Sequence, residues 1–198
     1  MTDQTAAATK PRKLRADAQR NYDALVAVAR QAFGERGAEA SLDDIAKRAG
    51  VGPGTLYRHF PTRDHLYRAV LEDWQEDVRA DGERLVRLAD EDPERALHEW
   101  ARNHYRHKSF FRGLHARLLA DADDDDKSVL FSCKTVLGEA AEGVLDRAKE
   151  AGLVRPEISF RMVSQLLSGI GMVDEQVPGG VDVEAQLDIV LSGIRPRT

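Results

Sequence analysis

One stretch of the sequence decides the fold, 41-SLDDIAKRAGVGPGTLYRHF-60. Apolar side chains recur at helical spacing on both sides of a turn at Gly50–Gly52, which predicts two short helices over residues 42–49 and 53–60. Ser41 is placed to cap the first helix, and Pro53 suits the first turn of the second. Two short helices joined by a glycine-containing turn form a helix-turn-helix, whose second helix can lie in the major groove of DNA.

The positions of this stretch have distinct physical roles in such a unit. Gly50 can adopt positive φ in the turn. The lack of bulky side chains at the leading end of the second helix lets backbone N–H groups approach phosphates, while side chains off the apolar stripe supply hydrogen-bond donors. The apolar wedge is Ile45, Ala46, Val51, Leu56 and Phe60, the leading end is Gly52, Pro53 and Gly54, and the donors are Thr55, Tyr57, Arg58 and His59. By spacing alone, a helical hairpin that serves only as scaffold remains an alternative.

The residues carry more than this spacing. The run 50-GVGPGTLYRHFPTRDHL-66 closely resembles the recognition segment of TetR-family transcriptional regulators, and 32-AFGERG-37 and 41-SLDDIA-46 resemble the first and second helices of that family. The resemblance covers roughly residues 15–72. It implies an all-helical homodimer with an N-terminal DNA-binding domain, a C-terminal ligand-binding and dimerisation domain, and a long fourth helix that links the two.

Carried over from this resemblance, the phosphate contacts fall on Ser41, Thr55, Tyr57, His59 and Arg63. Family members often have Lys at the last position, and Arg also binds phosphate, in a bidentate manner. Arg58 is the candidate for reading a base, since its fork matches guanine O6 and N7. Gly54 comes close enough to touch bases through its backbone. Two alternatives stay open: Tyr57 packs its ring under the helix, or Arg58 pairs with an acidic neighbour or touches only phosphate.

The charge of the chain is unevenly distributed. Its 198 residues carry a formal net charge of −5. Residues 1–70 hold 12 Lys and Arg against 8 Asp and Glu, a net of +4, whereas residues 71–198 hold 17 against 26, a net of −9. A basic head on an acidic body predicts that only the head meets a polyanion, because phosphate affinity depends on local positive charge.

The N-terminus predicts a cytoplasmic, nucleoid-associated protein without a membrane span. Residues 1–15 have no apolar core of the kind that a secretory signal requires, and no apolar run reaches the roughly 18 residues needed to cross a bilayer. Residues 1–14 are expected to be a disordered basic arm. The cations of this arm are Lys10, Arg12 and Lys13, and Arg15 follows directly. Together they either enter a minor groove of DNA or form a tail that phosphates attract weakly.

Apolar periodicity predicts an all-α fold of about nine helices. A helix-turn-helix DNA-binding domain is expected over residues 15–61. Residues 62–198 are expected to hold the linker helix, with Leu66, Val70 and Trp74 in its stripe, and the C-terminal ligand-binding and dimerisation domain. Lys108-Ser109 is expected to separate two helices of this body.

The body shows no catalytic constellation, and no metal or cofactor is expected. Cys133 lies among apolar positions of a helix, as a buried structural thiol does. His104 and His107 share a helix face at i and i+3, but no cysteine or carboxylate partner is identifiable from the sequence, which favours surface or pocket histidines. The body, weakly similar to the C-terminal domain of some actinobacterial family members, is expected to line a small-molecule pocket from this pool: Trp100, His104, Tyr105, Phe110, Phe111, Leu114, Leu118, Phe131, Thr135 and Met162.

The last two helices are expected to form the homodimer, since they carry more apolar stripe than a terminal pair can bury. In the family, the corresponding helices pair across a twofold axis into a four-helix bundle. The expected dimerisation residues are Val163, Leu166, Leu167, Ile170, Leu187, Val190, Leu191 and Ile194.

Together these features predict a non-enzymatic transcriptional regulator, a repressor released from a palindromic operator on double-stranded DNA by a small-molecule effector. Three alternatives stay open: an effector-independent DNA-binding protein, an activator, and an enzyme that uses a cavity between helices.

Overall fold

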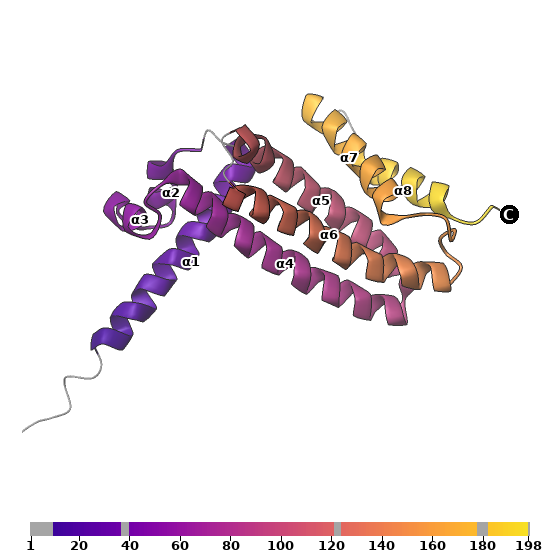
Figure 1. The fold of residues 1–198 in the computed structure, drawn as a ribbon, viewed down its shortest axis with the longest axis horizontal. Coiled ribbons are helices and arrows are strands. Elements are labelled where there is room, and N and C mark those ends of the chain that lie inside the picture. Colours follow the sequence, from indigo (N-terminus) through magenta and orange to yellow (C-terminus); the bar gives the residue numbers. More distant parts are fainter. Residues whose placement is uncertain (1–9, 37–39, 121–123, 178–181, 198) are drawn as a thin grey trace, which may run out of the picture. The chain divides into compact units, whose positions relative to one another are not determined.

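The computed structural model describes residues 10–36, 40–120, 124–177 and 182–197; side chains are described for these residues except 10–15, 108–134, 140, 172 and 174–176. The described residues form helices and connecting turns, with no strand among them, which confirms the all-α prediction. Within these described residues, eight helices follow one another (Figure 1): α1 Lys10–Arg36, α2 Leu42–Arg48, α3 Pro53–His59, α4 Arg63–Glu91, α5 Pro93–Ala120, α6 Asp124–Glu150, α7 Phe160–Gln176 and α8 Val183–Ile194.

Two of these helices differ from the predicted ones. The predicted break at Lys108-Ser109 is wrong, because α5 runs unbroken through both residues; neither residue type costs more than about 0.7 kcal/mol in a helix interior, so no breaker is present. The helix α1 begins at Lys10, five residues before the expected start of the first domain. Lys, Arg and Leu favour helix, and Pro11 is tolerated because it lies in the first turn.

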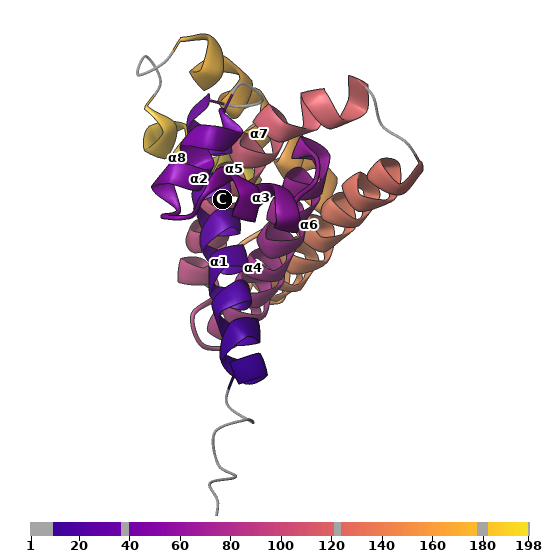
Figure 2. The ribbon, with the colours of Figure 1, turned by 90° about the vertical axis from the view of Figure 1, so that its left-hand side faces the viewer.

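The chain divides into two compact units, Met1–Asp73 and Trp74–Thr198. In the first unit, α2 and α3 both pack against α1 (Figure 2). The helix α1 buries one apolar face, with Leu25 and Ala29 fully buried, and the ring of Phe33 stacks on Tyr67 of α4 at a centroid distance of 4.3 Å. The apolar sides of these helices therefore pack together in one small core.

The turn between α2 and α3 is made by Gly50, whose φ of +71° confirms the predicted positive value. Ser41 caps α2, because its hydroxyl accepts a hydrogen bond from the backbone N–H of Asp44 (3.4 Å), and Pro53 opens α3. The wedge residues Ile45 and Leu56 are completely buried. The crossing of the two short helices is thus set by contacts that the sequence predicts.

In the second unit, α5 packs against α6 and α7, and α8 pairs with α7 and α5 (Figure 1). The core contains Leu97 and Trp100 of α5, Leu145 of α6, Leu167 of α7 and Leu191 of α8. None of the helices that the structure describes is long and apolar enough to cross a membrane.

Ion pairs join helices of this unit at its surface. Arg102 on α5 donates two parallel hydrogen bonds to the carboxylate of Glu184 on α8 (2.8 and 2.6 Å). Arg195, after α8, donates to Glu94 at the start of α5 (2.5 Å). The hydrogen bonds from Arg102 lower the pKa of Glu184, so this carboxylate stays ionised further into acid than a free glutamate.

Candidate nucleic-acid interface and interior cavity

The helix α3 presents most of the predicted DNA-binding side chains to solvent. Tyr57 is 48% exposed, so its ring does not pack under the helix. Arg58 is also exposed, and it makes no ion pair with any residue that the structure describes. Thr55 and His59 are half-buried on the same helix. A phenol, a guanidinium, a hydroxyl and an imidazole therefore lie on one helix as hydrogen-bond donors.

The leading end of α3 carries two glycines that the protein itself does not require. A Cβ added at Gly52 or Gly54 would meet no atom within 4 Å. Neither residue has positive φ, so neither needs glycine for its backbone conformation. The two glycines leave the backbone N–H groups of this helix end open to close approach from outside, as a phosphate or a base edge requires.

The other face of α3 is anchored in the core of the first unit. Leu56 and Phe60 are buried, and the ring of Tyr22 on α1 contacts both Phe60 (5.0 Å between centroids) and His59 (6.0 Å). Burial raises the pKa of Tyr22, with nearby carboxylates, Glu72 among them, adding to the effect. His59 therefore has a packing role as well as an exposed edge.

Arg63 is the first residue of α4, and it contacts the chain just before Ser41, the cap of α2. The guanidinium of Arg63 donates a hydrogen bond from Nη1 to the backbone carbonyl of Ala40 (2.6 Å), which ties the start of α4 to the residue before the cap of α2. Arg48 at the end of α2 forms a bidentate pair with Glu35 of α1 (3.0 and 3.4 Å), and its hydrogen bonds lower the pKa of Glu35. The Arg48–Glu35 pair therefore joins α2 to α1, and the Arg63–Ala40 hydrogen bond joins α4 to the start of α2.

The outer face of α7 and α8 is an apolar stripe, and it differs from the predicted dimerisation face. Met162, Leu166 and Val173 recur on one side of α7, and Val177 follows as its C-cap; each is about half exposed, and Ile189 of α8 is 70% exposed. The "outer stripe" below means these five residues. A groove of about 330 Å³ runs between the two helices; it is lined by Arg155, Ile158, Met162, Leu166, Ile189 and Gly193, among others.

Five of the eight predicted dimerisation residues are wrong for this purpose, because they are buried in the core of their own unit: Val163, Leu167, Leu187, Leu191 and Ile194. Leu166 is exposed, and Ile170 and Val190 are half-buried. The sequence pattern identified two amphipathic helices, but the prediction placed at the dimer interface the face that packs into the core of the same chain.

The predicted pocket residues do not all come together. Trp100 and His104 of α5 line one interior cavity, whereas Tyr105 packs at the edge of the core. Met162 and Thr135 are exposed, Met162 on the outer stripe. The remaining side chains of the pool lie outside those that the structure describes: Phe110, Phe111, Leu114, Leu118 and Phe131.

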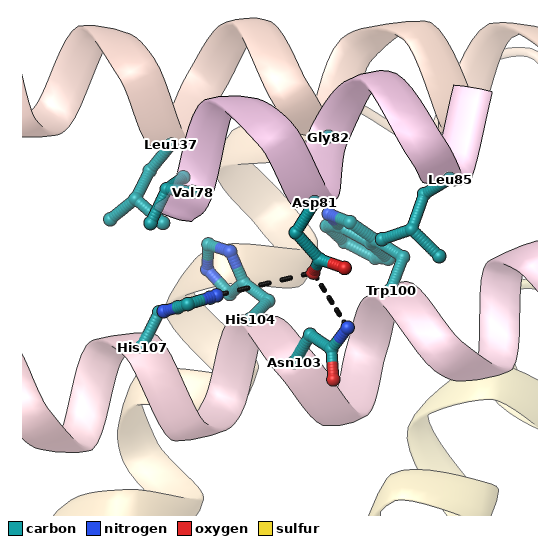
Figure 3. Close-up of a pocket in the computed structure, with 9 residues that line it drawn as sticks. All are labelled: Val78, Asp81, Gly82, Leu85, Trp100, Asn103, His104, His107 and Leu137. Carbon is teal, nitrogen blue, oxygen red and sulfur yellow. Dashed lines mark hydrogen bonds and ion pairs between the residues drawn. The ribbon is translucent and has the colours of Figure 1, made fainter. Parts of the chain in front are cut away.

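The interior cavity contains polar residues that the sequence analysis missed (Figure 3). Asp81 of α4 and Asn103 of α5 line it beside His104 and His107, and the Asn103 amide donates a hydrogen bond to Asp81 Oδ2 (2.6 Å). The volume is about 20 Å³, room for about one water molecule. Asp81 lies at helical spacing within the apolar series Trp74, Val78 and Leu85. A carboxylate at such an apolar position was the signal in the sequence that could have identified it.

His104 is connected to a third helix. It is 2% exposed and shares a hydrogen bond with the hydroxyl of Ser164 on α7, 3.2 Å from Nε2 to Oγ. Among the side chains that the structure describes, no group of three or more His, Cys, Asp or Glu residues is arranged to hold a metal ion.

Comparisons with known proteins match both units. Residues 25–70 match the family described as bacterial regulatory proteins, tetR family, and residues 92–196 match the C-terminal domain of SbtR-like transcriptional regulators. A curated relative, the HTH-type transcriptional regulator SAUSA300_2515 of Staphylococcus aureus, is 40% identical over 60 residues, which is 30% of this chain and only 32% of the relative.

Two solved structures are similar over nearly their whole length. The TetR transcriptional regulator SCO0520 from Streptomyces coelicolor is 30% identical with a TM-score of 0.74, and the match covers 89% of this chain and 99% of that one. A TetR transcription regulatory protein from Mycobacterium vanbaalenii is 32% identical with a TM-score of 0.69, and the match covers 92% of this chain and 99% of that one.

Proposed function

The chain belongs to the TetR family of DNA-binding transcriptional regulators, and from this premise we propose that it is a homodimeric repressor that a small-molecule effector releases from a palindromic operator. Residues 15–61, together with Arg63, bind DNA. Residues 62–198 bind the effector and form the homodimer.

The observation that carries the DNA-binding assignment is the bare leading end of α3. A side chain at Gly52 or Gly54 would meet no atom of the protein, and neither residue adopts a conformation that excludes a side chain. Close approach of DNA to the backbone therefore explains both glycines. Exposed Tyr57 and Arg58 follow one turn later. In this proposal Arg58 reads a base, and the other donors position the helix on phosphates: Ser41, Thr55, Tyr57, His59 and Arg63.

The homodimer forms through the outer stripe. An exposed apolar series along one helix is a surface that monomeric proteins seldom leave in water. A twofold axis places the same patch against itself, so Leu166 and Ile189 of each protomer bury against the partner subunit. The two recognition helices then meet half-sites one helical turn apart or a multiple of it, and the operator takes the same twofold symmetry.

Release is a shift in the population of dimer conformations. The effector binds more tightly to a dimer whose recognition helices are wrongly spaced for the operator, and its difference in affinity between the two states sets how far DNA binding falls. The helix α4 is the coupling element, because it carries residues of both units on one continuous helix.

A second candidate function, an effector-independent DNA-binding protein, is favoured by the small volume of the interior cavity. The two functions differ in one measurement. A repressor has ligands that lower operator affinity, whereas an effector-independent protein binds its site equally in every ligand background.

Selection of genomic DNA fragments by the purified full-length protein tests the proposal. We expect enrichment of a twofold-symmetric site, bound by an even number of chains. In a transcription assay, the bound protein should block access of RNA polymerase to a promoter that overlaps this site. Enrichment of no sequence would contradict the DNA-reading role of α3, and a bound site from which transcription rises would replace repression by activation.

A further inference from the structure

The second unit contains a small cavity with polar groups in its wall, beside the apolar core. A carboxylate, a carboxamide and two imidazoles line it, from Asp81 on α4 and from Asn103, His104 and His107 on α5 (Figure 3). The side chains of Asp81 and His107 keep 23% and 19% of their surface exposed, so the cavity is open to solvent. A partly open cavity with apolar walls and a few convergent polar groups is the usual form of a small-molecule site.

The two oxygens of Asp81 have different surroundings. Oδ1 accepts hydrogen bonds from Arg84, at 3.1 Å from Nε and 2.8 Å from Nη2. Oδ2 accepts from the neutral amide of Asn103 (2.6 Å) and lies 4.0 Å from Nε2 of His107. Figure 3 shows both contacts converging on this one oxygen between α4 and α5. Oδ2 therefore offers a cation a carboxylate oxygen that accepts its hydrogen bond from a neutral amide, that of Asn103.

The size of the cavity selects the kind of cation. With about 20 Å³, it accepts one group of the size of a water molecule. A primary ammonium has that size and carries three N–H donors and no acceptor. Asp81 supplies the acceptor, and the Trp100 ring in the same wall attracts a cation through its π face. The substituent on the ammonium then extends out of the cavity toward solvent. A planar guanidinium is larger, and an anion is repelled by Asp81.

We propose that this cavity binds the ammonium group of a primary-amine effector, with Asp81 as its counter-ion. This inference rests on the proposed effector-responsive function and names the chemistry of the effector. Side-chain contacts that join α4 to α5 along this seam include those of Trp74 with His107, Asp81 with Asn103, and Arg84 with Glu99. An ammonium on Oδ2 displaces the Asn103 amide, so binding weakens the attachment of α4, the helix that continues into the DNA-binding unit.

Two probes of nearly equal size test the charge requirement. Benzylamine and benzyl alcohol differ in one group, an ammonium against a hydroxyl. We expect calorimetric titration of the full-length protein at neutral pH to show benzylamine binding at least tenfold tighter than the alcohol. Asp81→Asn should abolish this preference. The matched control is Glu83→Gln, which removes one negative charge from an exposed position of the same helix and should leave the preference unchanged.

A gain-of-binding variant keeps the test informative if Asp81→Asn does not fold. Asn103→Ala removes the amide that competes for Oδ2, so benzylamine should bind several-fold tighter to it than to the unaltered protein. Equal binding of the two probes, no binding of either, or a preference that survives Asp81→Asn would overturn the inference and leave the cavity as the site of an ordered water.

Operator binding distinguishes this inference from the proposed function. Benzylamine should lower the affinity of the unaltered protein for its operator but not that of Asp81→Asn. If benzylamine binds with the expected preference and the operator affinity does not change, the amine site stands and effector-controlled release is wrong. If the operator is bound and neither probe binds, the amine site is wrong while the DNA-binding function stands.

Discussion

Gly54 shows how a single residue separates folding from function. It lies in the first turn of α3, and a side chain there would point into empty space. Gly54→Ala should keep or raise the thermal stability, because alanine favours a helix by up to about 1 kcal/mol over glycine. Operator affinity should nevertheless fall at least tenfold, since the methyl group blocks close approach of the backbone. Melting curves and operator titrations measure the two effects, and a variant with unchanged affinity would remove this helix end from the interface.

Tyr57 and Arg58 are neighbours with different proposed roles. Tyr57→Phe deletes one hydroxyl donor and should weaken binding to all DNA sequences by a similar factor. Arg58→Ala should instead reduce discrimination against substituted operators by about 1–3 kcal/mol at one position of each half-site. Titration of both variants against a panel of single-base operator substitutions distinguishes them. Identical profiles for the two variants would contradict base reading by Arg58.

At the scale of elements, Gly143 sets the approach of α6 to α4. A Cβ added there would lie 2.7 Å from Cγ2 of Val86, which is too close. Gly143→Ala should lower the free energy of unfolding by about 1–3 kcal/mol, the usual cost of overpacking. The matched control is Gly138→Ala on the same helix, where the nearest atom, in Phe160, is 3.5 Å away. That variant should be as stable as the parent or more so in a denaturant titration.

Val86→Ala identifies the contact responsible. Introduced together with Gly143→Ala, it removes the methyl groups that the new Cβ meets, so the double variant should be more stable than additivity of the two single changes predicts. Strict additivity would place the clash elsewhere on α4.

The proposed homodimer buries the outer stripe of α7 and α8. Leu166→Glu puts a charge on an exposed position and should leave the protomer folded, but it should raise the dissociation constant of the homodimer at least a hundredfold, since an unpaired charge in an interface costs several kcal/mol, roughly 3 or more. Ala80→Glu, an exposed helical position on α4, is the control. Sedimentation over a concentration series measures both, and a Leu166→Glu protein that stays dimeric would exclude the outer stripe.

At the scale of the whole molecule, surface ion pairs connect stability to acid. Arg102 lowers the pKa of Glu184, and Arg84 and Arg95 lower that of Glu99. A carboxylate whose folded-state pKa lies below its ordinary value of 4.5 stabilises the protein above that value, and the contribution is lost as the pH falls through the folded-state pKa. The melting temperature should therefore fall below about pH 4.5.

Glu184→Gln tests this coupling. It should melt lower than the parent at pH 7, and the difference should shrink as the pH falls below the ordinary carboxylate range, because the parent loses the same pair by protonation. Glu83→Gln, whose carboxylate lies 3.9 Å from Arg87 and is 73% exposed, should differ little from the parent at either pH. A Glu184→Gln protein whose melting difference stays constant with pH would contradict the coupling.

The sequence by itself determined the helix-turn-helix and the helical class. Those features depend on contacts a few residues apart: the glycine of the turn at Gly50, the cap at Ser41, and the apolar spacing of Ile45 and Leu56. Local backbone preferences and periodicity decide such contacts, so they can be read along the chain. The same reasoning failed at Ser109, where it predicted a break and α5 continues. A residue with a weak helix preference does not by itself end a helix.

Only the tertiary structure decided which face of a helix is inside. Leu167 and Leu166 are adjacent and equally apolar, but Leu167 is fully buried and Leu166 is 54% exposed, because the packing of α5 and α8 on α7 selects the inward side. The pairing of Asp81 with Asn103, 22 positions apart, arises from the same cause. Periodicity shows that a helix has an apolar face; the position of distant helices determines what that face, and each polar residue within it, contacts.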